Sequence, residues 1–186
     1  RMCHAVCRSA LERAVRDDLL RTNPAIGCKL PPKKAKEMQV LDREELQKFL
    51  IQAQADGYYE LFLLDLCTGL RRGELIALQW EDLNFETGVL TVNKQAYTVN
   101  GELQIIPPKT KASMRKLVLP PAVLAVLREY KKTVDSRWMF PSPVKADRPI
   151  TPGVARKRLQ TILERADCKR VRFHDLRHTF ATLALE

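Results

Sequence analysis

The chain has 186 residues and a formal net charge of +10, and 45% of its residues are hydrophobic and 29% charged. A chain of this length and composition can bury its own core, so we expect one soluble domain with or without part of a second. Its apolar runs fall short of the roughly 18 residues that a membrane span needs. Asp65 interrupts the best of them, so we expect no membrane partner.

The positive charge is concentrated in two late segments. Residues 106–119 hold four basic and no acidic residues, and residues 156–178 hold eight basic and three acidic ones. Residues 51–98, in contrast, hold three basic and seven acidic ones. Such clustering favours a polyanionic partner, with nucleic acid ahead of an anionic membrane.

The five cysteines are odd in number and irregularly spaced, which is not typical of a disulfide framework and favours a reducing cytoplasm. Cys3, His4 and Cys7 have no second pair of ligands nearby, so we predict no metal site. The first residues lack the apolar segment of a signal peptide.

In chain order, the first feature is an amphipathic helix from residue 2 to about residue 20, which ends before Asn23 and Pro24. We interpret residues 1–23 as the last helix of an N-terminal domain that precedes this sequence. Residues 24–40 combine prolines with lysines and are predicted to be a linker.

A second body begins with a strong helix start. Asp42 is placed as an N-cap and Glu45 as its capping-box partner, and the helix is expected to reach about Ala55. Residues 58–67 are apolar nearly all round, which predicts a buried helix, and Gly69 is its expected C-cap.

Arg71 follows that buried helix on a tight turn, before an apolar stretch that begins at Leu75. This placement predicts a rigidly presented guanidinium, as preorganised catalysis requires. The alternative is a local ion pair of Arg71 or Arg72 with Glu74.

Residues 88–120 change to the alternating pattern of strands, with Asn100-Gly101 as a hairpin turn. A basic loop over residues 108–116 is expected at the tip of this small sheet. It is either a solvated hairpin or a segment that contacts phosphate or base edges. Helices are predicted over residues 121–133 and from Thr151 to about Ala166, with Thr151 as N-cap and Pro152 at the first position.

The last stretch carries an apolar stripe of Phe173, Leu176, Phe180 and Leu183 at helical spacing. His174 and Arg177 are three residues apart and therefore share a face. A guanidinium beside a core needs a partner, which is either a carboxylate or a phosphate.

Three motifs in order carry a resemblance. Thr-Gly-Leu-Arg-Arg-Gly-Glu-Leu at 68–75, Lys109 in a basic β-hairpin, and His-Asp-Leu-Arg-His-Thr at 174–179 resemble the catalytic domain of the tyrosine recombinases, the phage-integrase family. The likeness covers about residues 40–186 and is greatest to integrases of conjugative transposons and temperate phages. It implies an α+β, mainly α-helical fold with a small three-stranded antiparallel sheet and a basic β-hairpin. Residues 41–186 would be the catalytic domain, and residues 1–23 the end of a core-binding domain.

The resemblance also implies roles. In that family a tyrosine attacks a DNA phosphodiester and forms a 3′-phosphotyrosyl bond, without metal or cofactor, on double-stranded DNA and within a homo-tetramer. Arg71 and Arg177 match the arginines that hold the phosphate oxygens, and His174 acts with them. Lys109 matches the proton donor to the leaving hydroxyl, with Lys111 as a competitor, and Glu74 matches an acidic support. The further basic residues expected to contact DNA are Lys111, Arg115, Arg156 and Arg158.

The chain departs from the family pattern in one respect. The family's nucleophilic tyrosine follows the His-x-x-Arg motif, whereas Tyr58, Tyr59, Tyr97 and Tyr130 all precede it. We therefore expect a catalytic domain that is incomplete at its C-terminus and inactive in cleavage by itself. The alternatives are a non-catalytic DNA-binding fragment or regulator, and a basic RNA-binding protein, although the basic segments hold few of the aromatic residues that stack on RNA bases.

Overall fold

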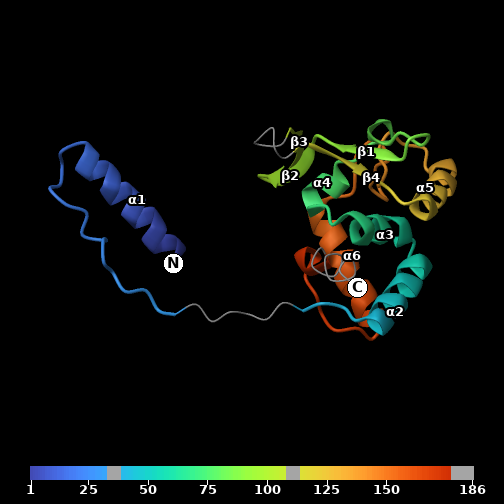
Figure 1. The fold of residues 1–186 in the computed structure, drawn as a ribbon, viewed down its shortest axis with the longest axis horizontal. Helices are drawn as coiled ribbons and strands as arrows, with labels where there is room; N and C mark the ends of the chain where they lie inside the picture. Colours follow the sequence, from blue (N-terminus) through green and yellow to red (C-terminus); the bar gives the residue numbers. More distant parts are fainter. Residues whose placement is uncertain (33–38, 108–113, 177–186) are drawn as a thin grey trace. The chain divides into compact units, whose positions relative to one another are not determined.

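A computed structural model of the chain describes residues 1–32, 39–107 and 114–176 (Figure 1). It divides into two compact units, Arg1–Glu37 and Met38–Glu186. The division falls inside the segment 24–40 that the sequence indicates as a linker. The assignment of the first unit to a preceding domain stays a prediction.

The first unit contains one helix, α1 (Met2–Arg16), which is shorter than the expected helix to about residue 20. The chain reverses at Asp18, which has a φ of 56°. The amide of Leu19 donates to the carbonyl of Ala14, and that of Asp18 to Val15, which is the Schellman arrangement that ends a helix. Asn23 then ties the returning segment to α1, because its amide donates to the Arg8 carbonyl at 3.0 Å.

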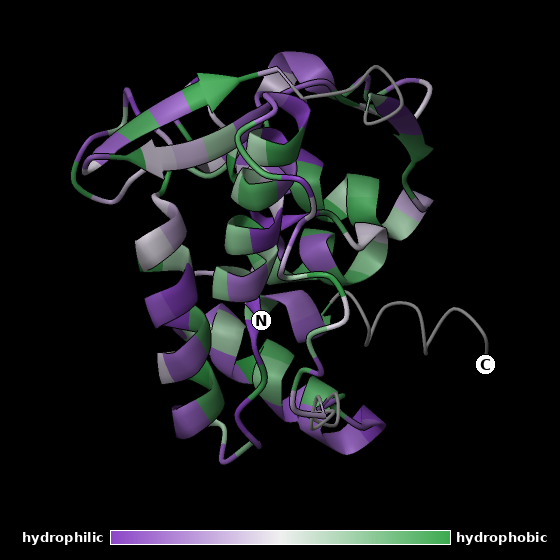
Figure 2. Cartoon of the chain, turned by 90° about the vertical axis from the view of Figure 1, so that its left-hand side faces the viewer, coloured by the Kyte–Doolittle hydropathy of each residue, from purple (hydrophilic) through white to green (hydrophobic). Residues whose placement is uncertain are grey.

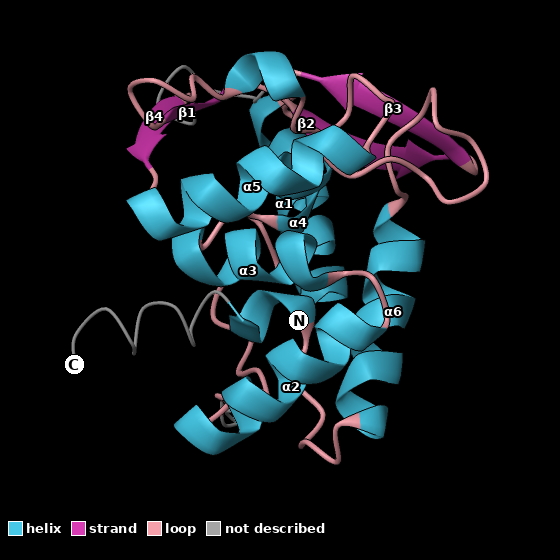
Figure 3. Cartoon of the chain, turned by 90° about the vertical axis from the view of Figure 1, so that its right-hand side faces the viewer, coloured by secondary structure: helices cyan, strands magenta, loops and turns pink. Residues whose placement is uncertain are grey.

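The second unit contains the remaining elements. They are α2 (Arg43–Ala55), α3 (Tyr59–Thr68), α4 (Arg72–Ile76), the 3₁₀-helix η1 (Trp80–Asp82), β1 (Val89–Val92), β2 (Gln95–Val99), β3 (Glu102–Ile106), β4 (Arg115–Val118), α5 (Pro121–Thr133) and α6 (Pro152–Arg165). Residues 173–176 are also helical. Figure 3 shows the strands gathered at one end of this unit and α2 at the other.

The helix starts follow the sequence signals closely. Asp42 accepts the amide of Glu45 at 2.9 Å and the Glu45 carboxylate accepts the amide of Asp42 at 3.0 Å, so the predicted capping box is present. Thr151 caps α6 by accepting the amide of Val154 at 3.3 Å, with Pro152 in the first turn. Each cap satisfies amides that a helix leaves without an internal partner.

The hydrophobic core brings the first helices of this unit, α2 and α3, together with its last described residues. Phe49 of α2 and Phe62 of α3 are fully buried, with ring centroids 5.1 Å apart in an edge-on contact. Phe173 contacts Phe62 at 6.1 Å, and Leu176 is also fully buried, so the described part of the predicted apolar stripe does face the core. Figure 2 shows hydrophobic and hydrophilic residues mixed along the helices, as helices with one buried face require.

The strands form two antiparallel pairs, β1 with β4 and β2 with β3. The second pair is a hairpin whose turn residues, Asn100 and Gly101, have φ of 51° and 84°. Positive φ at both positions identifies the tight turn that the Asn-Gly dipeptide predicts.

These pairs replace the single three-stranded sheet expected from the sequence. The ladder is interrupted at Asn93 and Lys94, where the Lys94 ammonium lies 2.9 Å from both Asp82 Oδ1 and Gln79 Oε1. These two contacts hold the segment between β1 and β2 against η1. The described strands on either side of the basic segment, β3 and β4, therefore belong to different sheets rather than to one hairpin.

The short helix α4 packs directly on β2. A Cβ atom at Gly73 would lie 2.8 Å from the carbonyl oxygen of Ala96, a separation that real side chains do not adopt. Glycine is therefore required for this close approach of two backbones.

Among the described residues, no helix is long and apolar enough to cross a membrane.

Candidate functional site

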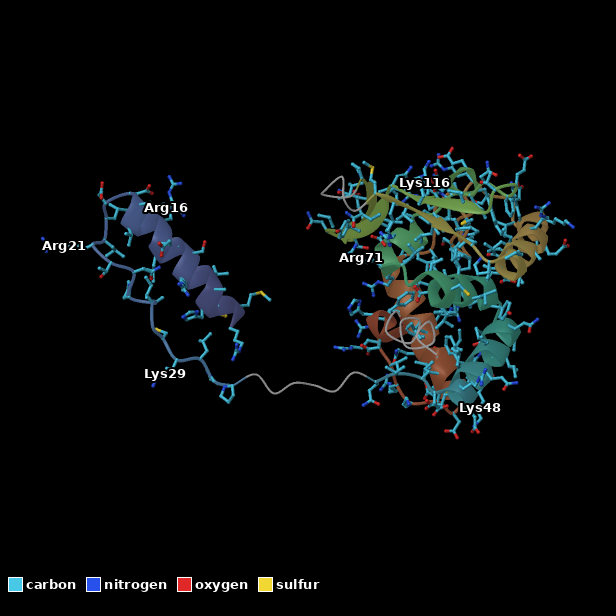
Figure 4. All side chains as sticks on the ribbon, in the orientation of Figure 1. Arg16, Arg21, Lys29, Lys48, Arg71 and Lys116 are labelled. Atoms are coloured by element: carbon cyan, nitrogen blue, oxygen red, sulfur yellow. The ribbon has the colours of Figure 1, made fainter. Side chains whose placement is uncertain are left out.

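Arg71 occupies the turn between α3 and α4, as the sequence predicts. Gly69 ends α3 in the left-handed region with a φ of 56°, and its amide donates to Asp65 at 2.8 Å. Leu70 is 2% exposed and fixes the turn against the core. Arg71 is the N-cap of α4, and its side chain is 59% exposed, so the guanidinium is held at the surface by a buried frame (Figure 4).

Glu74 connects Arg71 to a distant strand. The Glu74 side chain is only 3% exposed. It accepts the backbone amide of Arg71 at 2.9 Å and the Arg71 Nη1 at 3.0 Å. It also accepts Arg115 Nη2 at 2.8 Å and Arg115 Nη1 at 3.2 Å, from β4. These four hydrogen bonds fill the accepting capacity of the carboxylate.

The charges around Glu74 control its protonation. Burial raises the pKa of this carboxyl, but the hydrogen bonds from Arg115 and from the backbone and side chain of Arg71 outweigh burial. The pKa of Glu74 is therefore lower than that of an ordinary glutamate. The carboxylate remains charged and holds both guanidinium groups. The role of Glu74 as an acidic support of the catalytic site stays a prediction.

Arg115 was predicted from the sequence as a DNA contact, and the structure places its guanidinium on Glu74. Its neighbour Lys116 is exposed, since successive residues of a strand point to opposite faces. The two residues of the pair, Glu74 and Arg115, are 41 positions apart. No local spacing in the sequence indicates this contact, because it depends on how β4 lies beside α4.

His174 lies in the helical segment 173–176, between the buried side chains of Phe173 and Asp175, and is itself exposed. The start of this helix is held by Asp175, whose carboxylate accepts the amide of Arg172 at 2.9 Å and its Nη2 at 2.8 Å. The segment that carries His174 is thus anchored both by the core and by an ion pair. Lys109, Lys111 and Arg177 lie outside the described residues.

The basic residues of α6 do not form one face. Arg158 lies over the ring of Tyr58, with its guanidinium carbon 5.3 Å from the centroid, and Arg165 pairs with Asp56 at 2.7 Å. Arg156, two residues before Arg158, is exposed on a different side of the helix. The expected DNA contacts Arg156 and Arg158 therefore have different surroundings. The direct role of each in binding DNA stays a prediction.

Sequence reasoning missed one further arginine. Arg72, the first residue of α4, is partly buried. Burial lowers the pKa of its guanidinium, and the positive charge of Arg156 lowers the pKa further. The sequence indicates Arg72 only as an alternative partner of Glu74. That carboxylate is occupied by Arg71 and Arg115 instead.

Comparison with known proteins shows which family this chain belongs to. A model of the "Phage integrase family" matches residues 39–186. The ICEBs1 integrase of Bacillus subtilis (strain 168) is 26% identical to this chain over an alignment of 186 positions. The alignment covers 94% of this chain and 50% of that protein. The chain thus spans about half the length of the curated relatives it matches.

Two solved structures show the fold. The Tn1549 transposon integrase in complex with a circular intermediate DNA has a TM-score of 0.84 at 23% identity, over 96% of this chain and 63% of that one. The lambda integrase tetramer bound to a Holliday junction has a TM-score of 0.73 at 18% identity, over 100% and 53% respectively. Both likenesses extend across nearly the whole of the present chain.

Proposed function

Since this chain belongs to the phage integrase family, we propose that it provides the phosphate-binding part of a site-specific DNA recombinase. The reaction is strand cleavage and religation through a 3′-phosphotyrosyl intermediate. The observation that carries this proposal is the presentation of Arg71, a surface guanidinium held by a buried carboxylate at the end of a buried helix. The family comparison and the ordered motifs support the same assignment.

The geometry suits the chemistry of a phosphodiester. Charge accumulates on the non-bridging oxygens as the phosphorus is attacked, so a cation fixed in advance beside those oxygens lowers the barrier. Arg71 donates Nη1 to Glu74, and its side chain is 59% exposed. Because Glu74 fixes the guanidinium, little conformational freedom remains to be lost when phosphate binds.

The other roles follow the family pattern and complete the reaction. The attacking tyrosine hydroxyl gives its proton to His174 as its oxygen bonds to phosphorus. The bond from phosphorus to the 5′ oxygen breaks at the same time, and the leaving oxygen takes a proton. We assign that proton to Lys109, with Lys111 as the competing donor. Arg177 and His174 join Arg71 on the phosphate oxygens. None of these steps is assigned to a metal or a cofactor.

The nucleophile is not assigned to any of the four tyrosines in this sequence, which all precede His174. Burial, followed by the charges of Glu60 and Tyr58, raises the pKa of Tyr130 to about 12, which disfavours its phenolate. Tyr97 is exposed on β2, and its hydroxyl lies 3.0 Å from Gln95 Oε1. A non-catalytic DNA-binding fragment is accordingly the second candidate.

The partner is double-stranded DNA and the site of action the cytoplasm, where we propose that the protein works as a homo-tetramer. The DNA complex of the Tn1549 integrase supports the DNA partner, and the lambda integrase tetramer on a Holliday junction supports the tetramer. The excess of basic residues over residues 156–178 supplies attraction for phosphate that does not depend on sequence.

A direct test uses a pool of nicked suicide duplexes with randomised core sequence. The 186-residue chain should retain duplex in a shift assay and form no covalent adduct, whereas a form that carries the family's C-terminal tyrosine should become covalently attached. Tyr97→Phe is the control for adventitious attack in either form. An adduct mapped to Tyr58, Tyr59, Tyr97 or Tyr130 would contradict the assignment, and so would failure of both forms to bind duplex.

A further inference from the structure

A cavity of about 360 Å³ lies beside Arg71. It lies where α4, β2 and the start of α6 meet. Its lining consists of Arg71, Arg72, Gly73, residues 95–98 and Pro152. Two consecutive arginines therefore line one cavity, together with Gly73 and Ala96, whose backbones approach closely.

Arg72 has an unusual position for an arginine. It is partly buried, and its guanidinium makes no hydrogen bond or ion pair with any residue that the structure describes. The nearest carboxylate in sequence, Glu74, is already filled by four hydrogen bonds from Arg71 and Arg115. A partly buried cation without a counter-charge costs free energy, so the fold keeps a site that an anion would complete.

Arg156 strengthens this reasoning. It belongs to α6, which packs against α4, the helix that begins at Arg72. Burial lowers the pKa of the Arg72 guanidinium, and the charge of Arg156 lowers that pKa further. Two like charges repel, and an anion bound to both would offset that repulsion with two attractive interactions. Within the described part of α6, Arg158 is instead occupied by Tyr58 and Arg165 by Asp56.

We propose that Arg72 and Arg156 form a second phosphate site, which binds a backbone phosphodiester of DNA next to the phosphate held by Arg71. The proposal rests on the proposed function, because it takes the same DNA strand as ligand. Guanidinium groups match phosphate oxygens with paired hydrogen bonds, and among the described residues no carboxylate is paired with Arg72. The site reads no bases, so it sets register on the strand rather than sequence preference.

This site gives α4 two tasks on one turn. Arg71, neutralised in part by Glu74, is free to act where charge develops. Arg72, with no acidic partner among the described residues, contributes its full charge to ground-state binding. Side chains of consecutive residues diverge, so two neighbouring phosphates of one strand are reached from a single rigid backbone.

The test measures binding of the 186-residue chain to a 30-base-pair duplex by fluorescence anisotropy over a range of salt concentrations. Arg72→Gln and Arg156→Gln should each weaken binding and reduce the slope of log K against log salt by about 0.9. Lys132→Gln, which removes an exposed charge from α5 that pairs with Glu129, should leave the slope unchanged. Circular dichroism of each variant checks that it is folded.

Single methylphosphonates, which remove one phosphate charge at a time, locate the contact. In a duplex with a fixed nick, neutralising the phosphate beside the scissile one should weaken binding of the wild-type chain and have no further effect on Arg72→Gln. Free inorganic phosphate, added as a competitor, should displace DNA only weakly if the site needs the strand. Tight competition by phosphate would identify an ion site and overturn the assignment to DNA.

The outcomes separate this proposal from the one before it. If the wild-type chain binds duplex with a steep salt dependence and Arg72→Gln and Arg156→Gln match it in slope and in methylphosphonate profile, the second site is wrong and the recombinase assignment stands. If the wild-type chain does not bind duplex in a salt-dependent manner, both are wrong.

Discussion

Arg71 and Arg72 are adjacent in the chain and differ in almost every physical respect. Arg71 is mostly exposed and bonded to a buried carboxylate that a second arginine, Arg115, also holds. Arg72 is partly buried, and the charged group that shifts its pKa is another cation, Arg156. The difference teaches that residue type alone does not define a cation's role. The carboxylate beside it decides whether a guanidinium is fixed in place or left to recruit an anion.

The largest expected effect on stability comes from removing the shared carboxylate with Glu74→Gln. Breaking a fully buried ion pair costs about 3–5 kcal/mol. Because the Arg71 and Arg115 side chains are 59% and 29% exposed, we expect a smaller loss of about 2 kcal/mol in the free energy of unfolding, measured in urea. An unfolding free energy equal to that of wild type would contradict the claim that Glu74 fixes Arg71 and leaves Arg72 without an acidic partner.

The same variant has a pH signature. The pKa of Glu74 is lowered in the folded state, so its ionisation stabilises the fold above the unfolded pKa, near 4.3, and that contribution is lost as pH falls through the folded value. Wild type should therefore lose stability relative to Glu74→Gln on acidification below about pH 4.5. Parallel stability curves for the two proteins from pH 6 to pH 3 would show that Glu74 is not held as described.

Gly73→Ala should have the next largest effect, because the backbone that presents both arginines must move. The added Cβ would meet the Ala96 carbonyl at 2.8 Å, and overpacking of this kind costs about 1–3 kcal/mol. Gly153→Ala is the matched control, since a Cβ there lies 3.9 Å from Thr151 Oγ1, in ordinary contact. Equal urea midpoints for the two variants would contradict the tight contact between α4 and β2.

Arg115→Ala tests the contribution of β4 to the contact with Glu74. It leaves Glu74 with Arg71 alone, and we expect a loss of about 1 kcal/mol in unfolding free energy because the Arg115 side chain is partly exposed. Lys116→Ala, one residue away and exposed, should change stability little. If Arg115→Ala instead leaves stability unchanged and lowers the salt slope of DNA binding, the DNA-contact role predicted from the sequence is the better account.

The smallest effect on stability is expected for Arg72→Gln. Removing a partly buried charge that a neighbouring cation repels should leave the free energy of unfolding unchanged or raise it by about 0.5 kcal/mol. A thermal melt at low salt compares it with wild type. Clear destabilisation would mean that the Arg72 charge stabilises the folded chain, and would argue against a site kept for an anion.

The features that the sequence predicts correctly are those decided within a few residues. The capping box at Asp42, the left-handed Gly69, the Asn100-Gly101 turn and the Thr151 cap all depend on local backbone chemistry. The order of the three motifs in the sequence was enough to identify the family, whose model matches residues 39–186.

What the sequence could not predict depends on distant packing. The single expected sheet is two pairs because Lys94 binds Asp82 and Gln79, a contact between residues more than ten positions apart. The pairing of Arg115 with Glu74 and the approach of Arg156 to Arg72 likewise require the assembled fold. The roles implied by the family resemblance stay predictions for all of the site residues, which are Arg71, Glu74, Lys109, Lys111, His174 and Arg177.

The central claim is that Arg71, fixed by Glu74, acts on the charge that develops at the reacting phosphate. It is tested most directly by single-turnover cleavage of a nicked suicide duplex by a form that carries the family's tyrosine, at saturating protein. Arg71→Ala should slow cleavage by about 10²–10³-fold while the DNA dissociation constant changes only a few-fold, and Lys116→Ala should cleave at the wild-type rate. Cleavage by Arg71→Ala at the wild-type rate, or a loss confined to DNA affinity, would contradict the account.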